Sequence, residues 1–180
     1  MFALAVCGNQ NPPAETVESE TKLSENDKLN HWFEANYEEE LMMSPIGLTF
    51  LGRKERYDEI DDMTEAAEDE QLEWKRQTVE EMKASFDYAA LTDDAKLSYD
   101  LWAHQYEQSK NAVPFRRNDY VFTQMQGIHT FLPTLLLSFH KVEEASDMDA
   151  LISRVSGVGV AMNQLVDRAK LGAEEGVRPP

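Results

Sequence analysis

The sequence predicts an all-α protein of about five helices joined by short loops. Apolar residues recur at spacings of three and four in almost every periodic segment, which is the spacing of one helix face. We find no convincing strand pattern. With 180 residues, 42% of them hydrophobic, the chain can bury the core of one domain. Antiparallel helices with short connections would form a bundle or part of a larger helical shell.

The first predicted helix covers residues 25–43. Ser24 is a suitable N-cap, because its hydroxyl can accept a hydrogen bond from the first turn. Ser44-Pro45 ends the helix, since the residue before a proline avoids the α region. We expect residues 45–63 to be irregular, because glycines interrupt them and two adjacent aspartates favour turns. The apolar face of this helix consists of Leu29, Trp32, Phe33, Tyr37 and Leu41.

The second and third predicted helices cover residues 65–87 and 93–110, with Thr64 and Thr92 as caps. The third helix is apolar on two faces, so we expect it to be packed between neighbours. The second carries Leu72, Val79, Met82 and Phe86 on one face, with Trp74 to one side; the third carries Leu97 and Leu101 on one face and Tyr99, Trp102 and Tyr106 on the other.

Residues 116–128 leave two alternatives open, a short extended piece or a turn of helix. A helix is then predicted over 130–141, with Thr130 as cap and Pro133 in the first turn, where backbone N–H groups lack partners in any case. The last helix is predicted to begin at Asp147 or Asp149. Its packing seam is predicted to be Leu151, Val155, Val158, Met162, Leu165 and Ala169, beside Gly157 and Gly159, which permit close approach of a neighbour.

The charge balance is strongly acidic, with 17 Lys and Arg against 34 Asp and Glu and a net charge of −17. This argues against nucleic acid and anionic membranes as partners, because both require basic patches. Residues 58–73 contain nine carboxylates and no Lys or Arg. They form either a cation-binding loop or a solvated loop leading into an exposed helix face. The second is favoured, because the run lacks the Asp spacing and central glycine of a calcium loop.

The chain contains one cysteine, Cys7, so an internal disulfide is impossible. The segment Leu4-Ala5-Val6-Cys7-Gly8 resembles the end of a bacterial lipoprotein signal, in which the cysteine is lipidated. We therefore expect residues 1–23 to be a signal remnant and disordered tether, and residues 24–180 to be the helical domain. The expected location is the cell envelope or periplasm, with a lipid anchor through Cys7. The alternative is a disordered tail with a stray cysteine.

The histidines lack the spacing of a zinc site, which usually has two ligands close in sequence. His129 and His140 are eleven residues apart, and a helix that starts near Thr130 separates them. Arg116-Arg117 either clamps a substrate carboxylate or, as favoured, pairs with local acids at the surface. The serines have no obvious base partner, so nucleophilic catalysis has no support.

A set of short segments follows in a fixed order along the chain: Ser44-Pro45, Leu51-Gly52, Tyr57-Asp58, Asp61-Asp62, Gln124 to His129, Leu132-Pro133, His140, Ile152 to Val155, and Gly176 to Pro180. Together, in this order, they are similar to the N-terminal half of the bacterial "domain of unknown function 885" family. The resemblance covers about residues 25–180. It implies the N-terminal part of a larger, mostly helical, zinc-dependent peptidase-like protein, either secreted or anchored as a lipoprotein.

In that family a His-Glu-x-x-Pro-Gly-His-His motif lies in the second half, so the resemblance implies that this chain is a fragment, inactive alone and truncated before the zinc motif. Zinc and a peptide substrate are expected for the full-length parent. No catalytic or metal residue can be assigned here. Gln124, Gly127 and His129 are the candidates to face a substrate channel. The alternative is a membrane-tethered helical binding or scaffold module without catalysis. The oligomeric state stays open.

Overall fold

The computed structural model describes residues 23–125 and 127–178, and in these residues it is all-α without a β-strand, as the sequence predicts. The α-helices are α1 (Glu25–Met42), α2 (Pro45–Phe50), α3 (Glu65–Ser85), α4 (Asp93–Ala112), α5 (Ile128–Thr134) and α6 (Ala145–Glu174). Single turns of 3₁₀ helix cover Tyr88–Ala90 and Val113–Phe115, and a π turn covers Leu135–Phe139. The predicted tether, including Cys7, lies outside the described residues except for Leu23.

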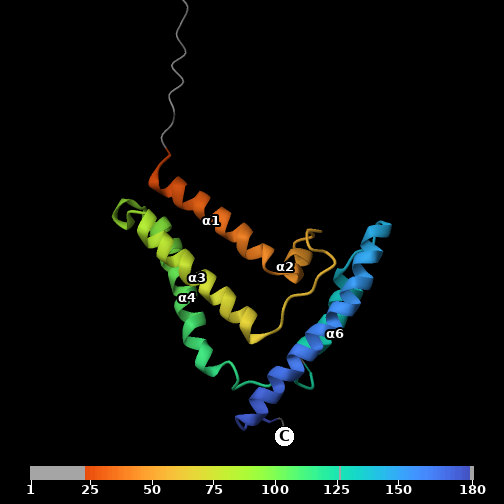
Figure 1. Cartoon of the computed structure of the whole chain (residues 1–180). Helices are drawn as coiled ribbons and strands as arrows, with labels where there is room; N and C mark the ends of the chain where they lie inside the picture. The colour runs from red at the N-terminus through yellow and green to blue at the C-terminus, as the bar shows by residue number, and fades with distance from the viewer. Residues whose placement is uncertain (1–22, 126, 179–180) are drawn as a thin grey trace, which may run out of the picture.

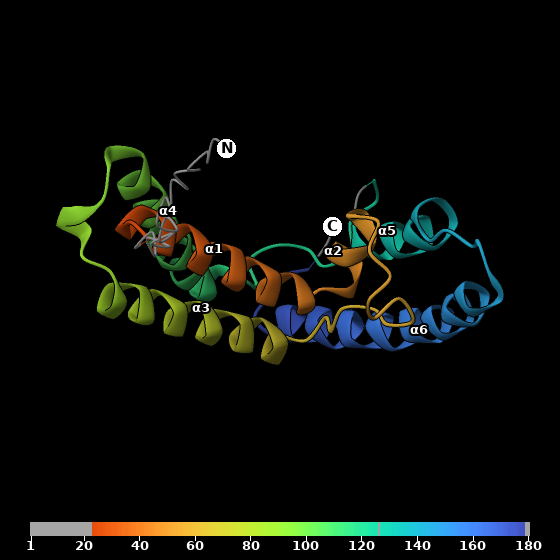
Figure 2. The same ribbon diagram turned by 90° about the horizontal axis from the view of Figure 1, so that it is seen from above.

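The helices form two arms of a V (Figure 1). The first arm consists of α1, α3 and α4, and the second consists of α2, α5 and α6. The two groups also lie apart in the view from above (Figure 2). Because α2 follows α1 directly but packs with the second arm, neither arm is built from one continuous stretch of chain.

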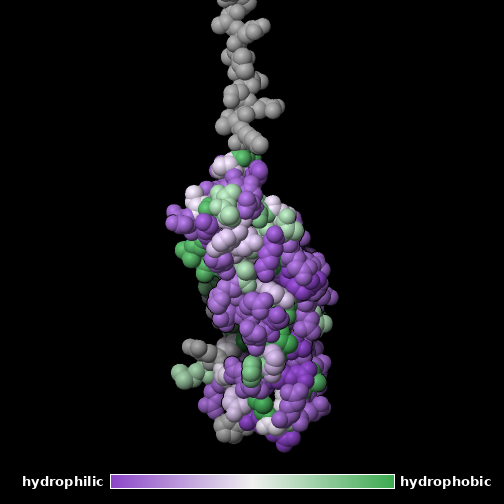
Figure 3. Space-filling view, turned by 90° about the vertical axis from the view of Figure 1, so that its left-hand side faces the viewer, coloured by the Kyte–Doolittle hydropathy of each residue, from purple (hydrophilic) through white to green (hydrophobic). Residues whose placement is uncertain are grey.

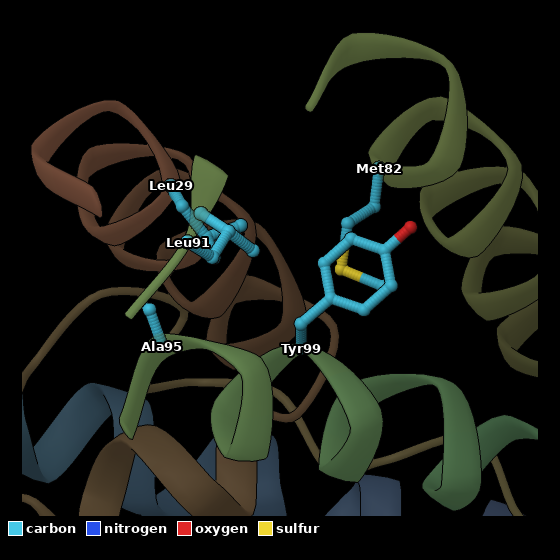
Figure 4. Close-up of a cluster of buried hydrophobic side chains, with 5 residues drawn as sticks. All are labelled: Leu29, Met82, Leu91, Ala95 and Tyr99. Atoms are coloured by element: carbon cyan, nitrogen blue, oxygen red, sulfur yellow. The ribbon is translucent and has the colours of Figure 1, made fainter. Parts of the chain in front are cut away.

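The first arm has its own hydrophobic core, to which all three helices and the turn before α4 contribute. Its buried members are Leu29, Met82, Leu91, Ala95 and Tyr99 (Figure 4). Trp32 packs edge-on against Phe86 and Trp102, with ring centroids 6.0 and 5.5 Å apart. Burial of each large apolar side chain contributes about 1.5–3 kcal/mol, so this cluster fixes how the three helices pack. The outer face on this side is mainly hydrophilic (Figure 3).

The second arm has a separate core, formed where α2 and α5 lie against α6. Its buried members are Ile46, Leu132, Leu135, Ala161 and Leu165. The connection 51–64 also approaches α6 closely: a Cβ added at Gly157 would lie 3.1 Å from Cγ1 of Ile60. The prediction that glycine in this helix permits close approach is therefore confirmed at Gly157.

The predicted irregularity of residues 45–63 is wrong at its start, where α2 forms. Proline at the first helical position loses no hydrogen bond, because that N–H has no partner in any helix. The Ser44 hydroxyl accepts from the backbone N–H of Gly47 (2.9 Å) and donates to Asp61 (2.7 Å). Asp61 also accepts from the N–H of Ile46 (2.8 Å). A carboxylate fifteen residues away thus stabilises the start of this short helix.

The start of α5 also differs from the prediction. The helix begins at Ile128, and the Thr130 hydroxyl donates to the Gly127 carbonyl (2.9 Å) instead of capping the helix. The chain remains helical through Pro133 into the π turn. Before it, residues 116–125 are irregular backbone with turns and bends, neither strand nor α-helix, so they form neither of the two alternatives.

Two predicted packing faces are wrong in part. Leu97 and Leu101 of α4 are 61% and 50% exposed, so most of that face is not covered by the described residues. On α6, Val155 of the predicted seam is 58% exposed, while Leu165 and the half-buried Val158 do pack into the core. The buried face of α6 is instead formed by Asp147, Arg154, Ala161, Leu165 and Gly172.

Candidate functional site

A cleft of about 800 Å³ lies where α1, α3 and α4 meet the connection to the second arm. Its size is that of a typical ligand site. Helix α3 contributes Leu72 and Lys75, α4 contributes His104 and Gln108, and the turn after α4 contributes Phe115. Phe115 is 64% exposed, so an aromatic ring is available to a bound molecule. This cleft is large enough to receive an extended ligand.

Most charged side chains of the cleft lie beside an opposite charge. Lys75 Nζ lies 3.3 Å from the Glu40 carboxylate and 3.8 Å from the centre of the Trp102 ring. Arg116 lies 2.6 Å from Asp69. His104 Nε2 lies 3.1 Å from the Gln108 amide nitrogen. This arrangement offers amides and apolar surface beside mostly paired charges, so it is suited to binding a backbone and apolar side chains.

A network of ion pairs joins the two arms beside this cleft. Glu65, at the start of α3, lies 2.9 Å from Arg116 and 2.7 Å from Arg117. Arg117 also pairs with Glu175, which follows α6. Arg168 of α6 lies 2.7 Å from Glu68 of α3. We call these side chains the joint. The prediction that Arg116-Arg117 pairs with acids is confirmed, but the expectation that these acids are local is wrong, because they come from α3 and from the residue after α6.

The contacts within the joint shift the pKa values of its side chains. The Arg117 hydrogen bonds, followed by the positive charges of Arg116 and Arg168, lower the pKa of the Glu65 carboxyl. The same bond raises the pKa of Arg117. Glu65 is 13% exposed in its side chain, so water screens these contacts only partly. A small pocket of about 60 Å³ lies against it, lined among others by Tyr120 and Gly172.

A buried polar cluster holds the second arm together. Arg154 is fully buried and donates to the carbonyls of Glu59 and Pro45 (2.9 and 3.1 Å) and to Oγ1 of Thr49 (2.7 Å). Its Nη1 lies 3.2 Å from Nδ1 of His140. Because arginine can only donate, that nitrogen accepts, and the His140 Nε2–H donates to the Asp147 carbonyl (2.9 Å). His140 is therefore held as one neutral tautomer.

The three candidate channel residues lie at the start of α5, outside the cleft. Gln124 is exposed, whereas Gly127 and His129 are half-buried and close together: a Cβ at Gly127 would lie 2.8 Å from Nδ1 of His129. That nitrogen is buried and has no partner among the described residues. The imidazole packs edge-on against Phe122, 5.4 Å away. Their role in a channel stays a prediction.

The acidic run 58–73 has mostly protein partners. Glu59 pairs with Arg56 and Glu73 with Arg76, and Asp62 accepts from the N–H of Thr64 (2.8 Å). Within residues 23–125 and 127–178, no group of three or more His, Cys, Asp or Glu side chains is arranged to hold a metal ion. In the same residues, no helix has the length and apolar character required to cross a bilayer.

One comparison with known proteins gives a match. The family model described as "Bacterial protein of unknown function (DUF885)" matches residues 45–180. Neither the curated proteins nor the solved structures contain a match. The matched range includes α2 to α6 and begins directly after α1.

Proposed function

The chain belongs to the bacterial family of unknown function DUF885, and on that premise we propose that it forms the helical wall of a substrate channel in a zinc-dependent peptidase-like protein. The described residues do not fit a zinc site. In this proposal the metal and the water-activating glutamate belong to other residues of the parent protein, and this chain binds and orients the peptide.

The observation that supports this proposal is the cleft between α1, α3 and α4. A peptide requires hydrogen-bonding groups along its backbone and apolar contacts for its side chains. Gln71, Gln105 and Gln108 can supply the first, and Leu72 and Phe115 the second. Because the joint lies beside the cleft, a peptide bound here would run toward α5. Gln124, Gly127 and His129 are proposed to line its continuation.

We propose that Cys7 anchors the protein in the bacterial envelope. This rests only on the resemblance of Leu4-Ala5-Val6-Cys7-Gly8 to a lipoprotein signal. Metabolic labelling with an alkyne palmitate should mark the wild-type protein and leave Cys7→Ser unmarked. Labelling of both would refute the anchor without touching the channel proposal.

The experiment that tests the channel is expression of the reading frame that includes this chain and whatever follows Pro180. We expect a His-Glu-x-x-Pro-Gly-His-His segment, about one bound zinc per molecule by elemental analysis, and hydrolysis of peptides. Phe115→Ala should raise the KM for peptides with little change in kcat, because it removes a contact made before and during reaction. Leu137→Ala, 86% exposed and outside the cleft, is the matched control.

A reading frame that lacks the zinc motif would contradict the peptidase proposal. It would favour the second candidate, a tethered helical binding module. The observation behind this candidate is an apolar groove of about 400 Å³ between α1 and α4, lined by Phe33, Tyr37, Leu101 and Trp102. Trp102 fluorescence would then report a bound ligand.

A further inference from the structure

The cleft between α1, α3 and α4 carries an excess of negative charge. Among the described residues that line it, carboxylates outnumber Lys and Arg side chains four to two: they are Glu40, Glu68, Asp69 and Asp119, against Lys75 and Arg116. Three of these carboxylates lie beside a basic side chain, and the pairs are Glu40–Lys75, Asp69–Arg116 and Glu68–Arg168. The excess charge of the cleft therefore belongs to the fourth carboxylate, Asp119.

Asp119 has no ion pair within residues 23–125 and 127–178. It is exposed, and its Oδ1 accepts a hydrogen bond from the backbone N–H of Tyr120 (2.7 Å), which leaves Oδ2 without a partner among those residues. Asp119 also lines the small pocket beside the joint, so it stands where the cleft meets that pocket. A ligand that enters the cleft therefore meets an uncompensated carboxylate.

The turn after α4 brings an aromatic ring and this carboxylate to the same cleft. The N–H of Asn118 donates to the carbonyl of Phe115 (2.9 Å), so the chain turns directly after the 3₁₀ helix Val113–Phe115. Phe115, whose ring is exposed, and Asp119 both line the cleft. A lysine or arginine side chain has an apolar stem and a charged end. Its stem can pack on the Phe115 ring while its charged end lies beside Asp119.

We propose that the cleft selects peptides that carry a Lys or Arg side chain, and that Asp119 is the residue that recognises this side chain. The inference rests on the proposed function, because it names the substrate class of the same cleft. Arg116, which lines the cleft on the same turn, lies 2.9 Å from Glu65 and 2.6 Å from Asp69, so two carboxylates offset its charge. The net charge of −17 also favours the approach of cationic peptides over acidic ones.

Matched peptides measure this preference. They are short peptides with acetylated and amidated ends that differ at one position, which is Lys, norleucine or Glu. Norleucine keeps the apolar stem of lysine without the ammonium group. Because Asp119 is exposed, we expect the Lys peptide to bind about three- to fivefold more tightly than the norleucine peptide, and the Glu peptide to bind most weakly. The preference should shrink between about 20 and 300 mM NaCl, because salt screens exposed charges.

Asp119→Asn isolates the contribution of the charge. The asparagine keeps a side-chain oxygen that can accept from the Tyr120 N–H, so the backbone of the turn is retained. This variant should lose most of the preference for the Lys peptide and bind the norleucine peptide as the wild type does. Asp94→Asn is the matched control, because it removes the same charge from the first turn of α4, at the end of that helix away from the cleft. It should keep the preference.

Isothermal titration calorimetry on the whole chain compares the three proteins, and circular dichroism checks that both variants keep the helical content of the wild type. A preference for the Lys peptide in the wild type and Asp94→Asn, but not in Asp119→Asn, would support the proposal. Equal binding of the Lys and norleucine peptides by the wild type, or a preference that survives Asp119→Asn, would overturn it and leave the proposed function intact. Failure of all three peptides to bind would contradict the proposed function, and this inference with it.

Discussion

Arg154 is the most constrained side chain of the second arm. It is fully buried, and its guanidinium joins α2, the 51–64 connection, α6 and the segment after the π turn. No carboxylate lies within ion-pair distance of it among the described residues, and burial lowers its pKa. The Tyr57 ring lies over the guanidinium, 4.8 Å from its carbon, and contributes a cation–π contact. A planar fork with several donors is required here.

Arg154→Lys should therefore destabilise the protein although it keeps the charge. An ammonium cannot reach the carbonyls of Glu59 and Pro45 and the Thr49 hydroxyl at once, so buried acceptors lose their donors. We expect a loss of about 3 kcal/mol in the free energy of unfolding, measured by urea denaturation. Arg178→Lys, at an exposed arginine, is the control. A loss below about 0.5 kcal/mol would show that the cluster is not structural.

Asp147 makes the stability of this arm depend on pH. The hydrogen bond from Lys54 (2.8 Å), followed by those from the N–H groups of Glu143 and Glu144, lowers the pKa of its carboxyl. The lowered value means that the contribution is complete above the unfolded pKa, about 4, and is lost as pH falls through the folded pKa. The wild type should thus exceed Asp147→Asn in stability at pH 6, and the difference should shrink as the pH falls below about 4.

Melting temperatures of both proteins between pH 7 and pH 2.5 provide the measurement. A difference that stays constant with pH would mean that packing, not ionisation, is lost in Asp147→Asn. The contribution of Lys54 to stability depends on pH in the opposite direction, because the same contact raises the pKa of its ammonium group. Its share is lost only in alkali, outside that range.

Helix α6 shows how a core face can contain few apolar residues. Its buried side combines Ala161 and Leu165 with Asp147, Arg154 and Gly172. The prediction used the periodicity of apolar side chains alone. It therefore assigned the neighbouring face, which contains Leu151 and Val155, as buried and missed the buried Arg154 and Asp147. Those polar residues occupy the core because partners from distant segments satisfy them.

Replacement of Leu165 tests this assignment of the buried face. Leu165→Ala removes a side chain that is 4% exposed and leaves a cavity, so we expect a loss of about 2–5 kcal/mol in unfolding free energy. Val160→Ala, on the exposed side of the same helix, should change it by less than about 0.5 kcal/mol. Calorimetric melting compares the two; equal losses would mean that the helix is rotated relative to this description.

The long helices α1, α3, α4 and α6 were predictable because each carries helical periodicity in its own sequence. Ser24 and Thr64 cap α1 and α3 as predicted, whereas the Thr92 side chain makes no capping hydrogen bond and α6 begins at Ala145, before the predicted Asp147 or Asp149. The short helix α2 was not, because the Asp61 carboxylate that holds its first turn lies outside it. The cleft was also not predictable from the sequence, because its walls come from three helices and a connection. Only the pairing of Arg116 and Arg117 with acids was foreseen, without the identity of those acids.

At the scale of the whole molecule, we expect the joint to set the angle between the arms. Their cores are separate, so the ion pairs around Glu65 and the Arg168–Glu68 pair are the polar contacts that link α3 to α6 at the base of the V (Figure 1). Partly buried networks of this kind are stronger than isolated surface pairs, but salt and acid still weaken them.

Glu65→Gln should loosen the angle between the arms without unfolding either core. It removes the charge that holds both Arg116 and Arg117. Spin labels on cysteines at Ser98 and Ser153, in a Cys7→Ser background, should give a broader distance distribution for Glu65→Gln. Glu73→Gln is the control, because Glu73 forms its ion pair only with Arg76 of the same helix. Identical distributions for both variants would show that the joint does not fix the angle.

The interleaved order of the two arms has a consequence for synthesis on the ribosome. The first core can assemble once α4 has emerged, but Ile46 must wait for Ala161 and Leu165, more than a hundred residues later. At typical elongation rates that delay is roughly ten seconds. During this time α2 is an apolar segment without its partners, tethered between two helices that have already folded. Chaperone binding to the nascent chain should therefore concentrate on residues 45–50, and end when α6 has emerged.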